Sequence, residues 1–238
     1  WTREDDVQHD YYHMVSAQRL SAGLDARGKV TAWQHRTAFP PIASTFADTG
    51  WPGEGELQQG VLDVPLAVPN VRAENGEAKA HTRIGWLRSV ANIYHCFAQQ
   101  SFIDEIAHAR GKDPKANLLE LIGPDRTVGL AELGIPELPN YGQPLTQHPI
   151  ETARLRRVVE RAAELSRWDA RASEKRTLGI AAHRSFVTYV AVVVSVVRQG
   201  ERIAVDEAWI VADAGIVVNL ERVRAIAETG VHFISVGA

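Results

Sequence analysis

The chain has 238 residues, 45% of them hydrophobic and 23% charged, and a formal net charge of −3 at pH 7, as expected for a globular protein with a sizeable core. This slightly negative net charge does not indicate binding to nucleic acid or to an anionic membrane. The single cysteine, Cys96, excludes an internal disulfide framework and an all-cysteine iron–sulfur site. The longest apolar run, residues 189–197, is too short to span a bilayer as a helix.

The first part of the chain predicts two strands within "SAQRLSAGLDARGKVTAWQHRTAF", joined by a turn at residues 25–28 where Gly28 supplies a positive φ. No signal peptide is visible and the chain begins at Trp1, so we expect that a preceding segment was removed. Residues 40–83 are rich in proline, glycine and polar residues, with little periodicity. Such a long irregular excursion is typical of functional or disordered segments.

The middle of the chain predicts three helices. Residues 89–110 have apolar side chains at helical spacing, and Gly111 ends the pattern. A short helix follows in "DPKANLLELI", with Asp113 as its N-cap and Pro114 at the first helical position. The third helix covers about residues 151–166, with its apolar residues on one face.

The last part predicts two long adjacent antiparallel strands, residues 179–197 and 202–213, joined by a tight turn at Gly200. The helices at 91–110 and 151–166 should cover one face of that sheet, which indicates an α+β fold. A final helix should begin after Asn219, its N-cap, and reach about Glu228, followed by a strand at residues 231–236.

Several arrangements suggest chemistry but have simpler explanations. His9 and His13 have the spacing of a zinc pair, but their surroundings read as strand or loop and lack an acidic general base, so we predict no metal site. His183 and Ser185 would share a face of a strand, without a nucleophile elbow around the serine. Cys96 lies in an apolar helix and is expected to be a small buried hydrophobic residue.

Two segments remain as candidate binding sites. In "GWLRSV", Arg88 stands where a loop enters a helix, and the positive helix end favours an anionic partner for it. That partner is either a carboxylate such as Asp104 or Glu105, or a bound anion. In "VADAGIVVN", backbone N–H groups between Asp213 and Asn219 could hold an anion, although helix capping alone also explains this sequence.

The order and spacing of several segments resemble one enzyme family: "RLSAGLDARGKVTAWQHR", "VPNVRAE", "GWLRSV…FAQQSFIDEIAHARGKDP", "LGIAAHRSFVTYVAVVVSV" and "VADAGIVVN". They resemble the molybdopterin-binding large subunit of isoquinoline 1-oxidoreductase-type enzymes, in the xanthine dehydrogenase and aldehyde oxidase superfamily. The resemblance implies hydroxylation of an N-heterocycle or aldehyde with water-derived oxygen, a molybdenum–pterin cofactor, and an iron–sulfur small subunit as electron-accepting partner. It implies that Arg88 acts beside the molybdenum centre, and that Ser89, Gly215 and Asn219 contact the cofactor.

The chain also departs from the family pattern. The family's glycine-rich pterin segments precede the position of Trp1, Ala225 stands where a cofactor-contacting Gln is expected, and the family's G-x-G-E glutamate lies beyond Ala238. We therefore expect residues 1–219 to be part of a molybdopterin-binding domain, inactive and without cofactor when alone, and prone to self-association. Residues 220–238 form a helix–strand tail, in which residues 223–238 resemble quinolinate phosphoribosyltransferase. The alternative is a non-enzymatic scaffold that retains the fold.

Overall fold

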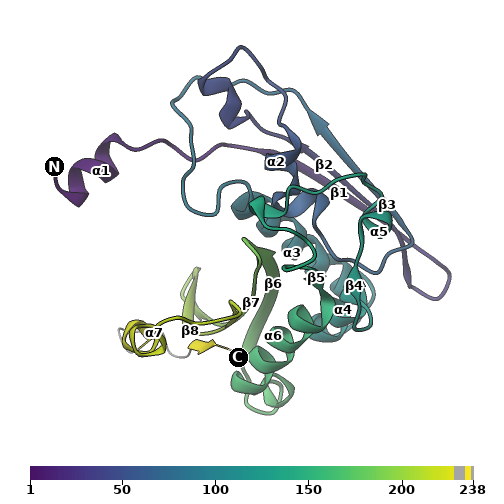
Figure 1. Cartoon of the computed structure of the whole chain (residues 1–238). Helices are drawn as coiled ribbons and strands as arrows, with labels where there is room; N and C mark the ends of the chain where they lie inside the picture. The colour runs from purple at the N-terminus through teal and green to yellow at the C-terminus, as the bar shows by residue number, and fades with distance from the viewer. Residues whose placement is uncertain (228–233, 237–238) are drawn as a thin grey trace. The chain divides into compact units, whose positions relative to one another are not determined.

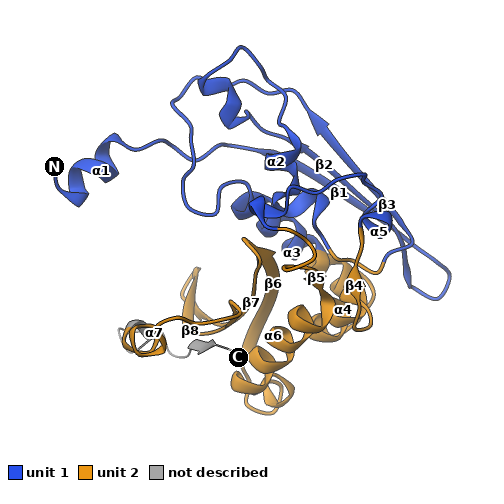
Figure 2. Ribbon diagram, in the orientation of Figure 1, with its two compact units in different colours: residues 1–64, 68–102, 130–143 blue, residues 65–67, 103–129, 144–238 orange. Residues whose placement is uncertain are grey.

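The structure, a computed structural model, describes residues 1–227 and 234–236. It divides the chain into two compact units (Figure 2). Unit 1 comprises residues 1–64, 68–102 and 130–143, and unit 2 comprises residues 65–67, 103–129 and 144–238. Helices and mainly antiparallel strands occur together in the chain, so the predicted α+β class is confirmed. The expected division at residue 219 concerns the origin of the tail and stays a prediction.

Unit 1 contains a three-stranded sheet in the order β1-β2-β3. The antiparallel pair β1 (Ala17–Leu24) and β2 (Val30–Ala38) confirms the predicted hairpin. In its turn, Gly28 has a φ of 76° and donates its N–H to the Asp25 carbonyl at 2.9 Å. Glycine adopts this left-handed conformation without a steric cost, which is why the turn could be predicted.

The third strand, β3 (Asn70–Gly76), pairs in parallel with β2 and lies inside the segment that we predicted to be irregular. The prediction was wrong for these residues. As an edge strand with its first four residues exposed, β3 lacks the apolar alternation that marks a half-buried strand. The rest of that segment holds only short helical turns: η1 (Ile42–Thr45), α2 (Glu54–Leu57) and η2 (Gln58–Leu62).

The remaining helices of unit 1 are α1 (Arg3–His9), α5 (Leu130–Leu133) and the 3₁₀ turn η3 (Asn140–Gly142). The long helix α3 (Asn92–Ala109) confirms the predicted helix, and its residues up to Phe102 belong to unit 1. A buried cluster forms part of the core of this unit: Met14, Phe39, Ile42, Ile84 and Val90. Each such side chain contributes about 1.5–3 kcal/mol on full burial.

Unit 2 contains a four-stranded sheet in the order β6-β7-β8-β9. Its strands are β6 (Thr177–Ser185), β7 (Thr188–Gln199), β8 (Arg202–Asp213) and β9 (Ile234–Val236). The antiparallel pairing of β7 with β8 confirms the predicted strand pair. The prediction of one strand over 179–197 was wrong, because a two-residue turn at Phe186 and Val187 divides it into the hairpin β6–β7.

Helix α6 (Thr152–Leu165) packs against β6, β7 and β8, as Figure 1 shows. Its buried residues Leu155, Val158 and Val159 lie on the predicted apolar face. Of the two helices expected to cover this sheet, α6 does so, whereas residues 92–102 of α3 belong to unit 1. The other elements of unit 2 are α4 (Pro114–Ile122), β4 (Thr127–Val128), β5 (Ile150–Glu151) and η4 (Trp168–Ala170).

The chain's last described elements are α7 (Leu220–Ala227) and β9, which pairs in parallel with β8. Both fit the helix and strand predicted for the tail; residues 228 and 231–233 of that prediction lie outside the described residues. Among the helices that are described, none combines the length and the apolar character needed to cross a membrane.

Candidate functional site

The candidate site in unit 1 is the turn that leads into α3. Ser89 and Val90 both have left-handed backbones, with φ of 67° and 47°. The turn closes through two backbone hydrogen bonds, from Val90 N–H to Leu87 O at 2.8 Å and from Asn92 N–H to Ser89 O at 3.0 Å. Left-handed conformations at non-glycine residues are uncommon, and Val90, which is β-branched, is an outlier of the kind that clusters at functional sites.

Arg88 projects from this turn into solvent. It forms no ion pair with any residue that the structure describes, so the alternative of a carboxylate partner such as Asp104 or Glu105 is not observed. Ser89 beside it is half-buried. The guanidinium therefore keeps its five donors available, a property that suits recognition of a carboxylate, phosphate or other oxyanion.

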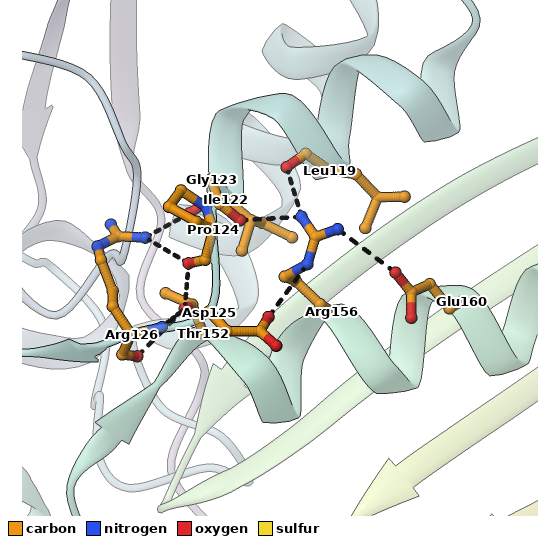
Figure 3. A network of polar contacts seen from close by, with 9 residues as sticks. All are labelled: Leu119, Ile122, Gly123, Pro124, Asp125, Arg126, Thr152, Arg156 and Glu160. Atoms are coloured by element: carbon orange, nitrogen blue, oxygen red, sulfur yellow. Dashed lines mark hydrogen bonds and ion pairs between the residues drawn. The ribbon is translucent and has the colours of Figure 1, made fainter.

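Two arginines of unit 2 provide a contrast, because their guanidinium groups donate to backbone carbonyls at the end of a helix. Arg156 donates to the carbonyls of Leu119 (3.1 Å) and Gly123 (2.8 Å) at the end of α4, as Figure 3 shows. Arg126 donates to the Ile122 carbonyl at 2.7 Å. The last carbonyls of a helix lack an N–H partner within the helix, so both arginines supply donors at the C-terminal end of α4. The Leu119 carbonyl also accepts the Gly123 N–H at 3.1 Å.

The Arg88 turn is held by polar groups of other segments. His13 Nε2 lies 2.8 Å from the Val90 carbonyl, and the Ala91 N–H donates to Gln59 Oε1 at 3.1 Å. Gly85, just before the turn, has no room for a side chain, since a Cβ there would lie 2.5 Å from Tyr11 Cγ. The turn is thus held from several sides before any ligand binds.

Beneath the turn lies a buried polar cluster that sequence reasoning missed. His95, which is fully buried, places Nδ1 2.8 Å from the Gln59 carbonyl and Nε2 3.0 Å from Thr37 Oγ1. His35 places Nε2 2.7 Å from Gln18 Oε1. Burial lowers the pKa of His35 to about 4, so the ring is neutral at pH 7. No motif links these residues, because they come from distant segments.

A second group of contacts fixes the η2 segment of unit 1. The Gly60 N–H donates to Asp63 Oδ1 at 2.8 Å, and the Tyr141 hydroxyl donates to Asp63 Oδ2 at 3.0 Å. Gly60 has a φ of 91°, which only glycine adopts readily. Gln99 of α3 donates to the Gly60 carbonyl. The η2 segment is therefore tied to α3.

The candidate site in unit 2 is the loop after β8. Arg154 binds Asp213 through two hydrogen bonds, and the Gly215 N–H donates to Asp213 Oδ1 at 3.1 Å. The hydrogen bond from Arg154 holds the pKa of Asp213 below its ordinary range, and Asp213 in turn raises the pKa of Arg154. Gly215 has a φ of 73°, and Asn219 Oδ1 accepts the Arg222 N–H at 2.9 Å, which confirms the predicted N-cap.

The four predicted site residues lie on two segments of the chain. Arg88 and Ser89 lie in the turn of unit 1, whereas Gly215 and Asn219 lie in the loop of unit 2. Their roles stay predictions. Within the described residues, no group of three or more His, Cys, Asp or Glu side chains could hold a metal ion. Cys96, which we expected to be a small buried hydrophobic residue, is half-buried, and burial raises the pKa of its thiol to about 11.

Sequence comparison shows which proteins the chain is similar to, although no family model matches it. It is 34% identical over 140 residues, 55% of the chain, to a protein of Gluconacetobacter polyoxogenes named membrane-bound aldehyde dehydrogenase [pyrroloquinoline-quinone]. It is 27% identical over 230 residues, 94% of the chain, to a nicotinate dehydrogenase subunit of Pseudomonas putida. It is 24% identical over 245 aligned residues, 97% of the chain, to the beta subunit of isoquinoline 1-oxidoreductase from Brevundimonas diminuta.

These relatives are oxidoreductases, two of them named as subunits, and the chain spans only 18%, 19% and 27% of their lengths. The predicted relationship is confirmed: the chain is similar to oxidoreductase subunits, among them the beta subunit of isoquinoline 1-oxidoreductase. Among solved structures, quinoline 2-oxidoreductase from Pseudomonas putida 86 aligns with 82% of this chain and 26% of that chain, at 16% identity and a TM-score of 0.45.

Proposed function

We propose that the chain is part of the molybdopterin-binding large subunit of a molybdenum hydroxylase, which oxidises N-heterocycles or aldehydes with oxygen derived from water. The observation that carries this proposal is the similarity to the nicotinate dehydrogenase and isoquinoline 1-oxidoreductase subunits across 94% and 97% of the chain. The aldehyde dehydrogenase relative supports the second substrate class. Because the chain spans about a fifth to a quarter of these proteins, it would supply one part of the large subunit.

Arg88 would be the catalytic contribution of unit 1. The bound molybdenum–pterin group would supply two-electron oxidation of the substrate. An exposed guanidinium that forms no ion pair with the described residues fits such a centre, because it can hold an anionic oxygen or stabilise negative charge that develops on the substrate. The turn is already fixed by contacts to Val90 and Ala91, so little reorganisation would be needed. Ser89 would contact the cofactor beside it.

Gly215 and Asn219 would contact the cofactor from unit 2. Gly215 leaves the loop backbone without a side chain, and its left-handed φ would strain any other residue. Asn219 is exposed, and its Oδ1 caps α7. The loop is anchored at Asp213 by Arg154, so its backbone donors keep a defined position.

Electrons would leave through an iron–sulfur partner subunit, as the resemblance to the family implies. The cofactor itself needs a direct test, because one relative carries pyrroloquinoline-quinone in its name. Pyrroloquinoline-quinone and the molybdenum–pterin group that the family implies are different redox groups. Metal analysis and quinone analysis of the same sample distinguish them.

The test is expression of this sequence with its flanking coding sequence and partner subunit in a host that makes molybdopterin. We expect about one molybdenum atom per large subunit, and dye reduction with nicotinate, isoquinoline or an aldehyde. The 238-residue chain alone should contain no stoichiometric molybdenum and show no turnover. A folded assembly with neither metal nor turnover would instead support the scaffold alternative, and bound quinone without molybdenum would overturn the cofactor assignment.

A further inference from the structure

The β1–β2–β3 sheet of unit 1 has one face that α3 leaves open. On β2, the Trp33 ring lies 5.2 Å from the ring of Phe102, and Thr37 Oγ1 lies 3.0 Å from His95 Nε2, both on α3. Side chains alternate between the two faces of a strand. Arg36 and its alternate neighbours therefore lie on the opposite face, which we call the outer face; its residues are exposed or half-buried.

The strand register places two polar rows across the middle of the outer face: Arg19–Arg36–Glu74 and Ser21–Gln34–Arg72. Glu74 pairs with Arg36 and, at 2.5 Å, with Arg72. Arg19 is directly opposite Arg36 and forms no ion pair in the part of the chain that is described. Like charges in directly opposed positions destabilise a sheet, so this face, with three cations and one anion, favours an anionic partner.

Two rows of mainly small residues flank the charges: Ala17–Ala38–Gly76 at one end and Gly23–Ala32–Asn70 at the other. They leave hollows of about 330 Å³ and 610 Å³ on the sheet. The outer face thus has a positively charged middle, formed by the two polar rows, and a hollow at each end. A solvated sheet face needs neither feature, whereas a bound segment would place charges on the charged middle and side chains in the hollows.

The chain itself carries a complementary segment. Glu4, Asp5 and Asp6 form the only run of three consecutive acidic residues in the sequence, and Asp10 follows. They belong to the acidic arm, residues 3–10, in which helix α1 has no buried residue. We propose that the outer face binds the acidic arm of a second copy of the chain. A reciprocal exchange of arms would use both contacts and give a closed, two-fold symmetric dimer.

This dimer should depend strongly on salt, because its contacts are exposed ion pairs. Screening shortens the reach of such charges from about 8 Å at physiological ionic strength to about 3 Å at 1 M. Sedimentation velocity of the whole chain over a wide concentration range, at low and at high salt, measures this directly. We expect a monomer–dimer equilibrium at low salt that shifts towards monomer at high salt.

A charge swap identifies the surfaces. The face variant Arg19→Glu/Arg36→Glu and the arm variant Glu4→Lys/Asp6→Lys should each raise the dimer dissociation constant by about tenfold or more, since like charges then meet. Asp5 is kept because it closes the capping box with Thr2. Mixed in equal amounts, the two variants should form a heterodimer, in which both contacts again join opposite charges.

Arg27→Glu/Lys29→Glu is the matched control, since it reverses two exposed charges in the hairpin turn and should leave dimerisation unchanged. Circular dichroism checks folding of every variant. Arg19→Glu alone is the milder variant, because Arg19 has no ion pair to lose among the described residues. A wild-type chain that is monomeric at all concentrations would overturn the proposal. So would a dimer insensitive to Arg19→Glu, or two reversed variants that do not associate with each other.

Discussion

Arg154 of α6 holds Asp213 at the end of β8 in a bidentate ion pair. Arg154 Nε lies 2.8 Å from Asp213 Oδ2, and Nη2 lies 2.6 Å from Oδ1. The side chains are 20% and 11% exposed, so water screens the pair only weakly. The Arg154 guanidinium also lies 4.5 Å above the ring of the fully buried Tyr189. One arginine therefore joins the helix, the sheet and the loop that begins after Asp213.

The first prediction is that breaking this pair is costly. Asp213→Asn should lower the free energy of unfolding by about 2–5 kcal/mol, because a poorly solvated guanidinium loses its counter-ion. Arg154→Lys should also lower the free energy of unfolding, but by less than Asp213→Asn, since the ammonium keeps the charge but cannot form the bidentate contact. Urea denaturation measures both. Arg161→Ala is the control: its pair with Glu164 is exposed and should be worth less than about 1 kcal/mol. Equal losses in the control and in Asp213→Asn would contradict the prediction.

The turn between β6 and β7 is strained by its residue types. Phe186 and Val187 have φ of 49° and 57°, a geometry that favours Asn-Gly. The second prediction is that Val187→Gly stabilises the chain by about 1 kcal/mol, because the left-handed conformation costs an L-residue roughly 1–2 kcal/mol. Thermal unfolding measures the change. Gly179→Ala, within β6 and close only to Val194, is a matched backbone control without a left-handed φ. A lower melting temperature for Val187→Gly would show that its side chain contributes more than the strain costs.

The same turn shows where sequence reasoning succeeded and where it failed. Gly28, the Asp113 cap and the Asn219 cap were predicted correctly, because each depends on chemistry within a few residues. The turn at Phe186 and Val187 was missed, since neither residue signals a hairpin. Cross-strand pairing and the sheet beneath override the local preference there.

The candidate site was predictable in part for the same reason. Arg88 was identified because a cation at a helix entrance is unusual within its own segment. The cluster that supports its turn joins Gln18, His35, Gln59 and His95, which are brought together only by the fold. No local pattern marks such a cluster. The β3 strand was missed likewise, because its pairing with β2 spans a long connection.

The buried His35 provides the third prediction, which concerns pH. Its pKa is about 4 in the folded chain and about 6.5 when exposed in the unfolded chain. Between these values the unfolded state binds more protons, so stability falls as pH drops from about 6.5 to about 4. The lost contribution is about 3 kcal/mol, an order-of-magnitude figure. The surroundings of the His35 ring agree with a neutral imidazole. Its Nε2 faces Gln18 Oε1, and its Nδ1 faces the Gln99 amide, 3.3 Å away.

Urea denaturation at a series of pH values measures this loss, and His35→Gln is the matched variant because it keeps a polar side chain without a proton to gain. The difference in slope between the two proteins isolates His35 from His183, whose pKa burial also lowers to about 4. The carboxylate of Asp213 acts in the same direction, but only as pH falls through its lowered pKa. Parallel curves for wild type and variant would show that His35 does not titrate as burial requires.

The last prediction separates structure from chemistry at Arg88. In the 238-residue chain, Arg88→Ala should change the free energy of unfolding by less than about 0.5 kcal/mol, because the side chain is exposed and forms no ion pair among the described residues. In a cofactor-bearing assembly, the same substitution should lower kcat by about 10²–10³-fold, as expected when a donor to developing charge is removed. Arg88→Lys should recover part of the rate, since it keeps the charge but loses the planar fork. Arg27→Ala, another exposed arginine of unit 1, should leave both quantities unchanged. A severe loss of stability in Arg88→Ala would assign the residue to the fold, and wild-type turnover with full molybdenum content would remove it from the chemistry.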